Sequence, residues 1–185
     1  MATNMDQDIQ TILVTETELD RVTFRIASEI DRDYKDAEHL VLLCILKGSI
    51  VFTGELMRKL TIPSEIDFMK VSSYGSGTTS SGRVNIILDI MRSDLNECDI
   101  LIIEDIIDSG RTLSYLAEYL RLKGAKSVKT CALLDKPSRR EVDFQPDYIG
   151  LEIPDEFVVG FGLDYDERYR QLPYIGILKP SVYEK

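Results

Sequence analysis

The sequence predicts an α/β fold in which helices flank a central, mostly parallel sheet. Short apolar runs, typical of strands buried on both faces, alternate along the chain with segments of helical periodicity. The 185 residues contain no repeat and no linker, and 44% are hydrophobic, so we expect a single domain over 1–185. The longest apolar runs fall far short of the roughly 20 residues that span a bilayer, so we expect no membrane partner.

Each element of this fold has its own pattern. Helices are predicted where apolar residues recur every three or four positions, at 15–34, about 49–60 and 113–123. Thr15 or Thr17 can cap the first helix, and Gly124 suits the end of the last. Strands are predicted at continuous or alternating apolar runs, at 39–46, 65–73, 84–88, 99–103, 127–134, 147–151 and 157–161. The tail from Asp164 is mixed.

One segment, 74–82 (YGSGTTSSG), is built almost entirely from glycine, serine and threonine. It matches neither of the common glycine-rich nucleotide fingerprints. It is either a flexible connector or a lid that orders over a ligand, and the residues alone leave both open.

The charge balance excludes a general polyanion binder. The formal net charge is −10, so nucleic acid and anionic lipid are poor partners for the surface as a whole. An anionic ligand must be met by local cations, backbone N–H groups or a metal.

The cysteines and the lone histidine point away from zinc. The three cysteines are scattered, without a C-x-x-C pair, and fit buried hydrophobes in a reducing compartment. We expect His39 to be structural or exposed, because one histidine cannot build a usual zinc site. The acidic N-terminus does not resemble a secretory signal, and we expect a cytoplasmic protein.

The strongest chemical signal is ILIIEDIIDSGRT, at 100–112. Three carboxylates, Glu104, Asp105 and Asp108, follow a buried strand at the end where α/β proteins bind ligands. The next four residues offer hydroxyls, free N–H groups and a helix N-terminus, which together favour a phosphate: Ser109, Gly110, Arg111 and Thr112. Carboxylates beside a phosphate cradle are consistent with a ligand that also carries hydroxyls and Mg²⁺. An acidic, solvated turn with an ordinary helix cap is the alternative.

This motif resembles the phosphoribosyl-diphosphate (PRPP) motif of the type I phosphoribosyltransferases, in particular their hypoxanthine–guanine branch. Four further segments resemble that family in the same order, over about residues 10–180: Leu46-Lys47-Gly48-Ser49, Ser73-Tyr74 with the glycine/serine stretch, Leu134-Asp135-Lys136, and 156–165 with Arg170 after it. Arg111 stands where relatives often carry lysine. The resemblance implies a core over about 36–155 and a small hood from about 1–15 and 156–185.

The resemblance also implies roles on the PRPP side. Glu104 and Asp105 hold the ribose hydroxyls, and Asp108 acts as general base near the purine N7. Residues 109–112 bind the 5′-phosphate. Pyrophosphate is bound by Lys47, Gly48 and Arg170, and the mobile loop begins at Ser73 and Tyr74. The bond before Lys47 is often cis in this family.

On the base side, the resemblance implies a purine pocket formed by Lys136, Phe157, Val158 and Asp164. An ammonium only donates hydrogen bonds, so Lys136 favours a 6-oxopurine, hypoxanthine or guanine, over adenine. Mg²⁺ is the implied cofactor, with Glu104, Asp105 and Asp164 as its ligands. The implied activity is purine salvage, with PRPP as phosphoribosyl donor, in a homodimer or homotetramer.

Three other interpretations stay open at this stage. The chain could be a PRPP-sensing regulator that binds nucleic acid, an enzyme for adenine or a pyrimidine, or an inactive structural subunit. The net charge disfavours the first, and the filled polar positions of the motifs disfavour the last. We expect the short basic segment Ser138, Arg139 and Arg140 to be a solvated loop.

Overall fold

The structure of this chain, a computed structural model, describes residues 4–73 and 84–184. Its α-helices are α1 (Glu16–Asp33), α2 (Ile50–Met57), α3 (Arg111–Leu122) and α4 (Pro180–Tyr183). Its 3₁₀ turns are η1 (Asn4–Asp8), η2 (Leu95–Glu97) and η3 (Pro137–Arg139). Its strands are β1 (Ile9–Val14), β2 (Leu40–Leu46), β3 (Glu65–Ser73), β4 (Val84–Leu88), β5 (Asp99–Ile107), β6 (Ser127–Asp135), β7 (Tyr148–Glu152), β8 (Val158–Val159) and β9 (Ile175–Leu178).

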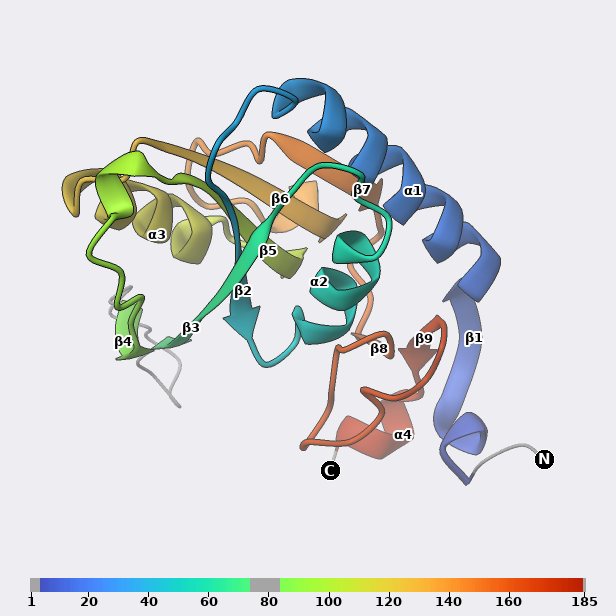
Figure 1. Cartoon of the computed structure of the whole chain (residues 1–185). Helices are drawn as coiled ribbons and strands as arrows, with labels where there is room; N and C mark the ends of the chain where they lie inside the picture. Colours follow the sequence, from blue (N-terminus) through green and yellow to red (C-terminus); the bar gives the residue numbers. More distant parts are fainter. Residues whose placement is uncertain (1–3, 74–83, 185) are drawn as a thin grey trace.

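A six-stranded sheet forms the centre, in the order β4-β3-β2-β5-β6-β7. Every neighbouring pair is parallel except β3 and β4. Helices α1 and α2 cover one face, and α3 covers the other (Figure 1). The predicted α/β fold with a mostly parallel sheet is therefore confirmed.

The sheet is buried on both faces because its strands send apolar side chains alternately to the two helix layers. In β2, Leu42 packs toward α1 and α2, whereas Val41 and Leu43 pack toward α3. Strand β5 repeats this alternation with Leu101 and Ile102, all of these side chains being fully buried. The continuous apolar runs of the sequence therefore mark these strands correctly.

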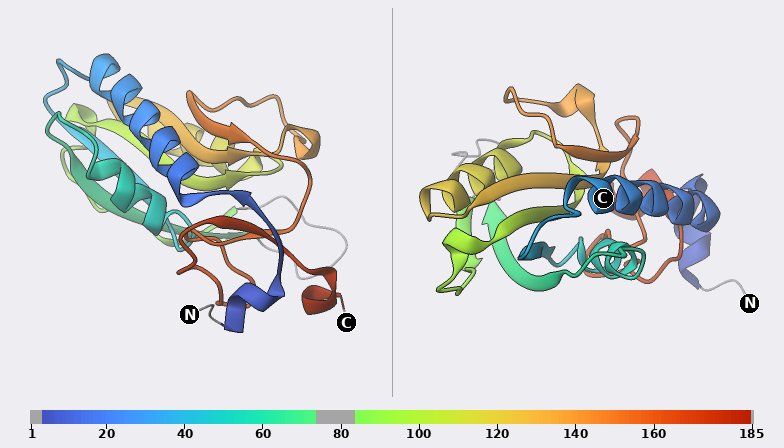
Figure 2. Two further views of the ribbon diagram at one scale, coloured as in Figure 1. Left: turned by 90° about the vertical axis from the view of Figure 1, so that its right-hand side faces the viewer. Right: turned by 45° about the horizontal axis from the view of Figure 1, so that its top comes forward.

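A second, three-stranded sheet joins the two ends of the chain. Strand β9 lies between β1 and β8 and is antiparallel to both. The small sheet and α4 lie beyond one end of the large sheet (Figure 2). The prediction missed β1 and β9, because three of the six residues of β1 are exposed and a glycine interrupts the four of β9. The domain boundaries named above stay a prediction.

Several element bounds also need correction. Strand β5 continues through the acidic residues to Ile107 instead of ending at Ile103, since it pairs with β6 up to Asp135. Helix α3 begins at Arg111, and the strand expected at 157–161 is only Val158–Val159.

Three smaller predictions, for the cysteines, His39 and Gly124, agree with the structure. The three cysteines are buried and free. The side chain of His39 is 42% exposed and lies 3.3 Å from a Glu65 carboxylate oxygen. Gly124 ends α3 with φ 101°. Across the described residues, no helix is both long and apolar enough to cross a membrane.

Thr15 begins α1 with a capping box that can be tested. The backbone N–H of Glu18 donates to the Thr15 hydroxyl at 3.3 Å, and the Thr15 N–H donates to the Glu18 carboxylate at 2.8 Å. Thr15→Ala should lower the free energy of unfolding by about 1 kcal/mol, measured by urea titration. Thr17→Ala, two residues later and inside the same helix, is the control and should change the free energy of unfolding by less than about 0.5 kcal/mol. Equal effects of the two substitutions would contradict the assigned cap.

Candidate functional site

The predicted site residues meet because three parallel strands end at the same edge of the large sheet. Cys44 of β2 pairs with Ile103 of β5, and Ile107 of β5 pairs with Asp135 of β6. The loops that follow these strands therefore carry Lys47, the acidic motif and Lys136 to one place, where open α/β sheets bind ligands.

Glu104 and Asp105 form an acidic pair on the last part of β5, in which Glu104 is half-buried and Asp105 is buried. Asp105 is 8% exposed and accepts the Ile106 N–H at 3.0 Å. One carboxylate oxygen of Glu104 is buried and has no hydrogen-bond partner among the described residues. Burial raises the pKa of Glu104 well above its usual range, and the nearby Asp105 charge adds to this rise. Burial also raises the pKa of Asp105, although hydrogen bonds and the Arg170 charge lower it in part.

The phosphate turn, residues 108–112, connects β5 to α3. Gly110 caps the helix in the left-handed region at φ 79°, which a glycine adopts without strain. The twelve-residue helix α3 then starts at Arg111, so its free N–H groups open onto the turn. A cavity of about 130 Å³, named here the phosphate cavity, lies at this turn; its lining includes Glu104, Asp108, Gly110 and Thr112. The backbone and dipole thus suit an anion, as expected.

Gly48 lies where three segments come closest together. A Cβ atom at this position would be 1.7 Å from an Asp105 carboxylate oxygen. On its other side, a Cβ atom at Gly162 (φ 103°) would be 2.1 Å from the Gly48 carbonyl oxygen. The Leu46–Lys47 peptide bond just before it is cis. Only a glycine at 48 permits this approach between the end of β2 and the acidic pair.

The predicted pyrophosphate cations are bridged by a glutamate. The Lys47 ammonium donates to both carboxylate oxygens of Glu167, at 2.9 and 3.0 Å. Arg170 lies 3.4 Å from the same carboxylate and 2.9 Å from Asp164. The two cations lower the pKa of Glu167, the hydrogen bond from Lys47 having the largest effect. Lys47 and Arg170 are therefore brought together, but through an internal anion.

Asp164 stands apart from the other predicted metal ligands. Its carboxylate pairs with Arg170 and accepts the Glu167 N–H at 2.9 Å. Within 4–73 and 84–184, no three acidic, histidine or cysteine side chains are arranged to hold one metal ion. The structure thus brings Glu104 and Asp105 together but does not add Asp164 to the same cluster.

The four predicted purine residues line one cavity of about 240 Å³, named here the base cavity. Lys136, Phe157, Val158 and Asp164 share it with four others: Ile106, Asp108, Arg139 and Leu163. Asp108 and Ile106 also line the phosphate cavity. The two cavities therefore adjoin at Asp108, which is the geometry that a ligand with a base and a phosphate requires.

Lys136 is a buried lysine, not a surface one. It is 4% exposed, and its ammonium donates to the Glu156 carbonyl at 2.8 Å and lies 3.8 Å from Asp108. Burial lowers its pKa, and the Asp108 carboxylate offsets part of this effect.

Phe157 is the aromatic side of the base cavity. It is 39% exposed, so it is not a core residue, and Tyr183 of α4 stacks on it at 4.8 Å between ring centroids. Ser73 ends β3, and the remaining loop prediction, Tyr74 with 74–82, lies outside the described residues.

Within the basic segment 138–140, Ser138 and Arg139 are exposed as predicted, but Arg140 contradicts the prediction of a solvated loop. The Arg140 side chain is only 13% exposed, and it donates to the Asp108 carbonyl at 2.6 Å. Arg139 lines the base cavity and pairs with Asp155. The sequence did not point to Arg140 or Glu167, because Arg140 contacts the Asp108 carbonyl and Glu167 contacts Lys47, both of which are distant in the chain. Asp135, an acidic residue that ends a buried strand five residues before Arg140, was the one available signal that a cation lies nearby.

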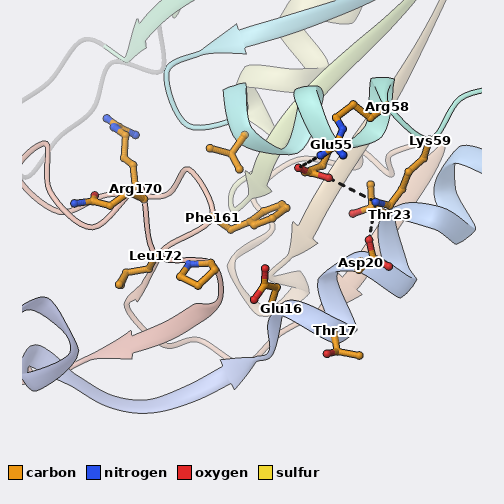
Figure 3. Close-up of a pocket in the computed structure, with 13 residues that line it drawn as sticks. Glu16, Thr17, Asp20, Thr23, Glu55, Arg58, Lys59, Phe161, Arg170 and Leu172 are labelled. Carbon is orange, nitrogen blue, oxygen red and sulfur yellow. Dashed lines mark hydrogen bonds and ion pairs between the residues drawn. The ribbon is translucent and has the colours of Figure 1, made fainter. Parts of the chain in front are cut away.

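A cavity of about 670 Å³, larger than the two at the predicted site, lies elsewhere, between α1, α2 and the segment 170–173. At one end, ion pairs already join Lys59 to Asp20 and Glu55, and Phe161 lies between this end and Leu172 (Figure 3). Arg170 is the one predicted site residue in its lining. Size alone therefore does not identify the site.

Known proteins resemble this chain both in fold and in sequence. Residues 11–166 match the family described as "Phosphoribosyl transferase domain". The chain is 51% identical to the hypoxanthine-guanine phosphoribosyltransferase of Bacillus subtilis, over 97% of this chain and 99% of that protein. It is 50% identical to the protein of the same name from Lactococcus lactis, over 98% of each.

A solved structure, a hypoxanthine phosphoribosyltransferase from Staphylococcus aureus, superposes with a TM-score of 0.94 at 45% identity, covering 100% of both chains. The fold is that of the type I phosphoribosyltransferases. The chain belongs to the phosphoribosyltransferase family.

The close approach at Gly48 gives a first test of the site. In Gly48→Ala the new methyl group must displace the acidic pair, so we expect the KM for PRPP to rise, or kcat to fall, by about tenfold or more in a steady-state assay. The control is Gly54→Ala in α2, where a Cβ atom has no neighbour within 4 Å. It should leave both constants unchanged. Unaltered constants in Gly48→Ala would contradict the described geometry.

The buried acidic pair gives a second test, on stability. Since the folded pKa of Glu104 is raised, the folded protein binds its proton more tightly than the unfolded chain does. This group therefore destabilises the metal-free protein increasingly as pH rises above about 4.5 towards the folded pKa. Glu104→Gln should raise the free energy of unfolding by on the order of 1 kcal/mol at about pH 8 and by almost nothing at about pH 4.

Urea unfolding at both pH values, with EDTA present, measures this difference. The exposed Glu97 offers the matched substitution, Glu97→Gln, which should change the free energy of unfolding by less than about 0.5 kcal/mol. A Glu104→Gln protein that is less stable at pH 8 would show that the pair is stabilising and would contradict this account.

Proposed function

We propose that this chain transfers the 5-phosphoribosyl group of PRPP to hypoxanthine or guanine, which yields the nucleoside monophosphate and pyrophosphate. The observation that carries the proposal is the pair of adjoining cavities on either side of Asp108. One presents a helix N-terminus to a phosphate, and the other presents an aromatic ring and a buried lysine to a base. The named relatives support the same activity.

On the donor side, each segment end has a proposed role. The N–H groups of the phosphate turn bind the 5′-phosphate, and Ser109 and Thr112 add hydroxyls. Glu104 and Asp105 accept hydrogen bonds from the ribose hydroxyls. Lys47 and Arg170 bind the pyrophosphate, for which they must give up their contacts with Glu167. Gly48 has no side chain, so its backbone can approach the pyrophosphate closely.

On the acceptor side, the base lies between Phe157 and Ile106. Lys136 is proposed to turn from the Glu156 carbonyl, its partner at 2.8 Å, to the 6-oxo group of the purine. Since an ammonium has no acceptor, it does not suit the 6-amino group of adenine. The backbone of Val158 lies in the same lining and offers groups to the base edge.

The proposed reaction breaks the bond between C1′ and the pyrophosphate oxygen, and the purine nitrogen forms the new bond to C1′. Positive charge develops on the ribose ring, and negative charge develops on the departing pyrophosphate, where Lys47 and Arg170 stabilise it. Asp108 is proposed to accept or stabilise the proton at N7, and the cation of Lys136 lies 3.8 Å from its carboxylate.

The acidic pair fits a divalent cation. Glu104 has a buried carboxylate oxygen that lacks a partner in the described part of the chain, and hard oxygen ligands suit Mg²⁺. We propose that Glu104 and Asp105 hold Mg²⁺ together with PRPP, either directly or through water. Bound there, the ion would neutralise charge on the pyrophosphate. Asp164 would join as a second site only after leaving Arg170.

Two further properties belong to the same proposal. The family resemblance supports a homodimer or homotetramer, and the scattered free cysteines support a reducing, cytoplasmic compartment. A PRPP-sensing regulator that binds nucleic acid is the alternative, and the net charge of −10 disfavours it.

A single panel assay tests the proposed function. The chain is incubated with PRPP, Mg²⁺ and one of hypoxanthine, guanine, xanthine, adenine or uracil, and pyrophosphate release is measured. Turnover with hypoxanthine or guanine, and none with adenine or uracil, is expected. Exclusive use of adenine or uracil would contradict the role given to Lys136, and no turnover with any base would contradict the proposed function.

Asp108 gives the sharpest single substitution. Asp108→Asn keeps the shape but cannot accept a proton, so we expect kcat to fall by about 10²-fold or more, with a smaller change in KM. The control is Asp143→Asn, since Asp143 is exposed and lies outside both cavities. Wild-type kcat in Asp108→Asn would remove Asp108 from the mechanism.

A further inference from the structure

The turn that follows β6 packs directly on the phosphate turn. Beyond Lys136, the chain makes the short helix η3 and returns past Asp108 and Ser109. The N–H of Glu141 donates to the Ser109 carbonyl at 3.0 Å, and the Arg111 guanidinium donates to the Glu141 carboxylate at 2.6 Å. Two segments from different strands therefore hold each other at the point where a phosphate is expected.

Arg140 makes the most buried of these contacts. Its guanidinium donates to the Asp108 carbonyl at 2.6 Å and to the Asp135 carboxylate at 2.5 Å. The side chains of Arg140 and Asp135 are 13% and 2% exposed. A planar guanidinium can serve two acceptors in fixed directions at once, which an ammonium cannot do as well. The contact therefore fixes a backbone carbonyl relative to the end of β6.

The same side chain fits against the left-handed residue of the turn. A Cβ atom at Gly110 would lie 2.9 Å from the Arg140 Cδ and 3.2 Å from Val142. The Arg140 side chain thus occupies the space that a larger residue at 110 would need. A glycine-containing turn is otherwise conformationally free, and an anion cradle binds best when its N–H groups are already in place.

We propose that Arg140 is a positioning residue for the donor site: it holds the backbone of the phosphate turn in the conformation that binds the 5′-phosphate of PRPP. Through Asp135, the neighbour of Lys136, it also ties this turn to the end of β6. Arg140 does not line either cavity, so its effect is indirect. The inference rests on the proposed function for the identity of the ligand, but not for the rigidity of the turn.

Two substitutions separate geometry from charge. Arg140→Gln removes the bridge. Arg140→Lys keeps a cation beside Asp135, which protects folding, but one ammonium does not span both acceptors. The matched control is Arg25→Gln, because Arg25 also pairs with a carboxylate, Glu29 at 2.9 Å, and donates to the Ile149 and Gly150 carbonyls, far from both cavities.

The first readout is kinetic. We expect both Arg140 variants to raise the KM for PRPP by about tenfold while changing the KM for hypoxanthine by less than about twofold. Arg25→Gln should change neither. A KM for PRPP within about twofold of wild type in both Arg140 variants would overturn the proposal, and so would full recovery of that KM by lysine.

The second readout does not depend on activity. Hydrogen–deuterium exchange of amides 108–112 should become faster in both Arg140 variants and stay unchanged in Arg25→Gln. Unchanged exchange in the Arg140 variants would overturn the proposal even if their activity were low. If the wild-type chain failed to turn over PRPP with any base, the proposed function would fail, and the exchange measurement would still decide whether Arg140 holds the turn.

Discussion

Two neighbouring carboxylates at the end of β5 are buried where negative charge is costly, and the site is arranged around that cost. Glu104 has a carboxylate oxygen without a hydrogen-bond partner among the described residues, and burial raises the pKa of both Glu104 and Asp105. Gly48 can approach this pair only because it has no side chain. Such a pair destabilises the metal-free protein when it is charged, so its position near the end of β5 is explained by the cation and ribose that we propose it binds.

The cations around this pair form ion pairs with acidic residues of the same chain. Lys47 pairs with Glu167. Three arginines near the site also have acidic partners: Arg139 pairs with Asp155, Arg140 with Asp135, and Arg170 with Asp164 and Glu167. These pairs neutralise the cations of the site in a protein whose net charge is −10. A phosphorylated ligand would therefore exchange partners with carboxylates that are already present. This exchange favours a ligand that arrives with its own divalent cation.

The sequence predicted the parts of this site that depend on local pattern. Strands β2, β5 and β6 each contain a continuous apolar run, and the polar residues at the ends of these runs must share one edge of a parallel sheet. Long-range partners could not be predicted in this way. The contact of Arg140 with the Asp108 carbonyl joins residues 32 positions apart, and that of Lys47 with Glu167 joins residues 120 apart. Strand β9 was missed for a related reason, because its pairing with β1 connects the two ends of the chain.

We propose that the acidic pair Glu104 and Asp105 requires a divalent cation before PRPP can bind. Isothermal titration calorimetry of PRPP into the purified protein, with excess Mg²⁺ and again with EDTA, tests it most directly. We expect the dissociation constant to rise by about tenfold or more when Mg²⁺ is removed, which corresponds to about 1.4 kcal/mol. Equal affinity for PRPP in the two conditions would contradict the account.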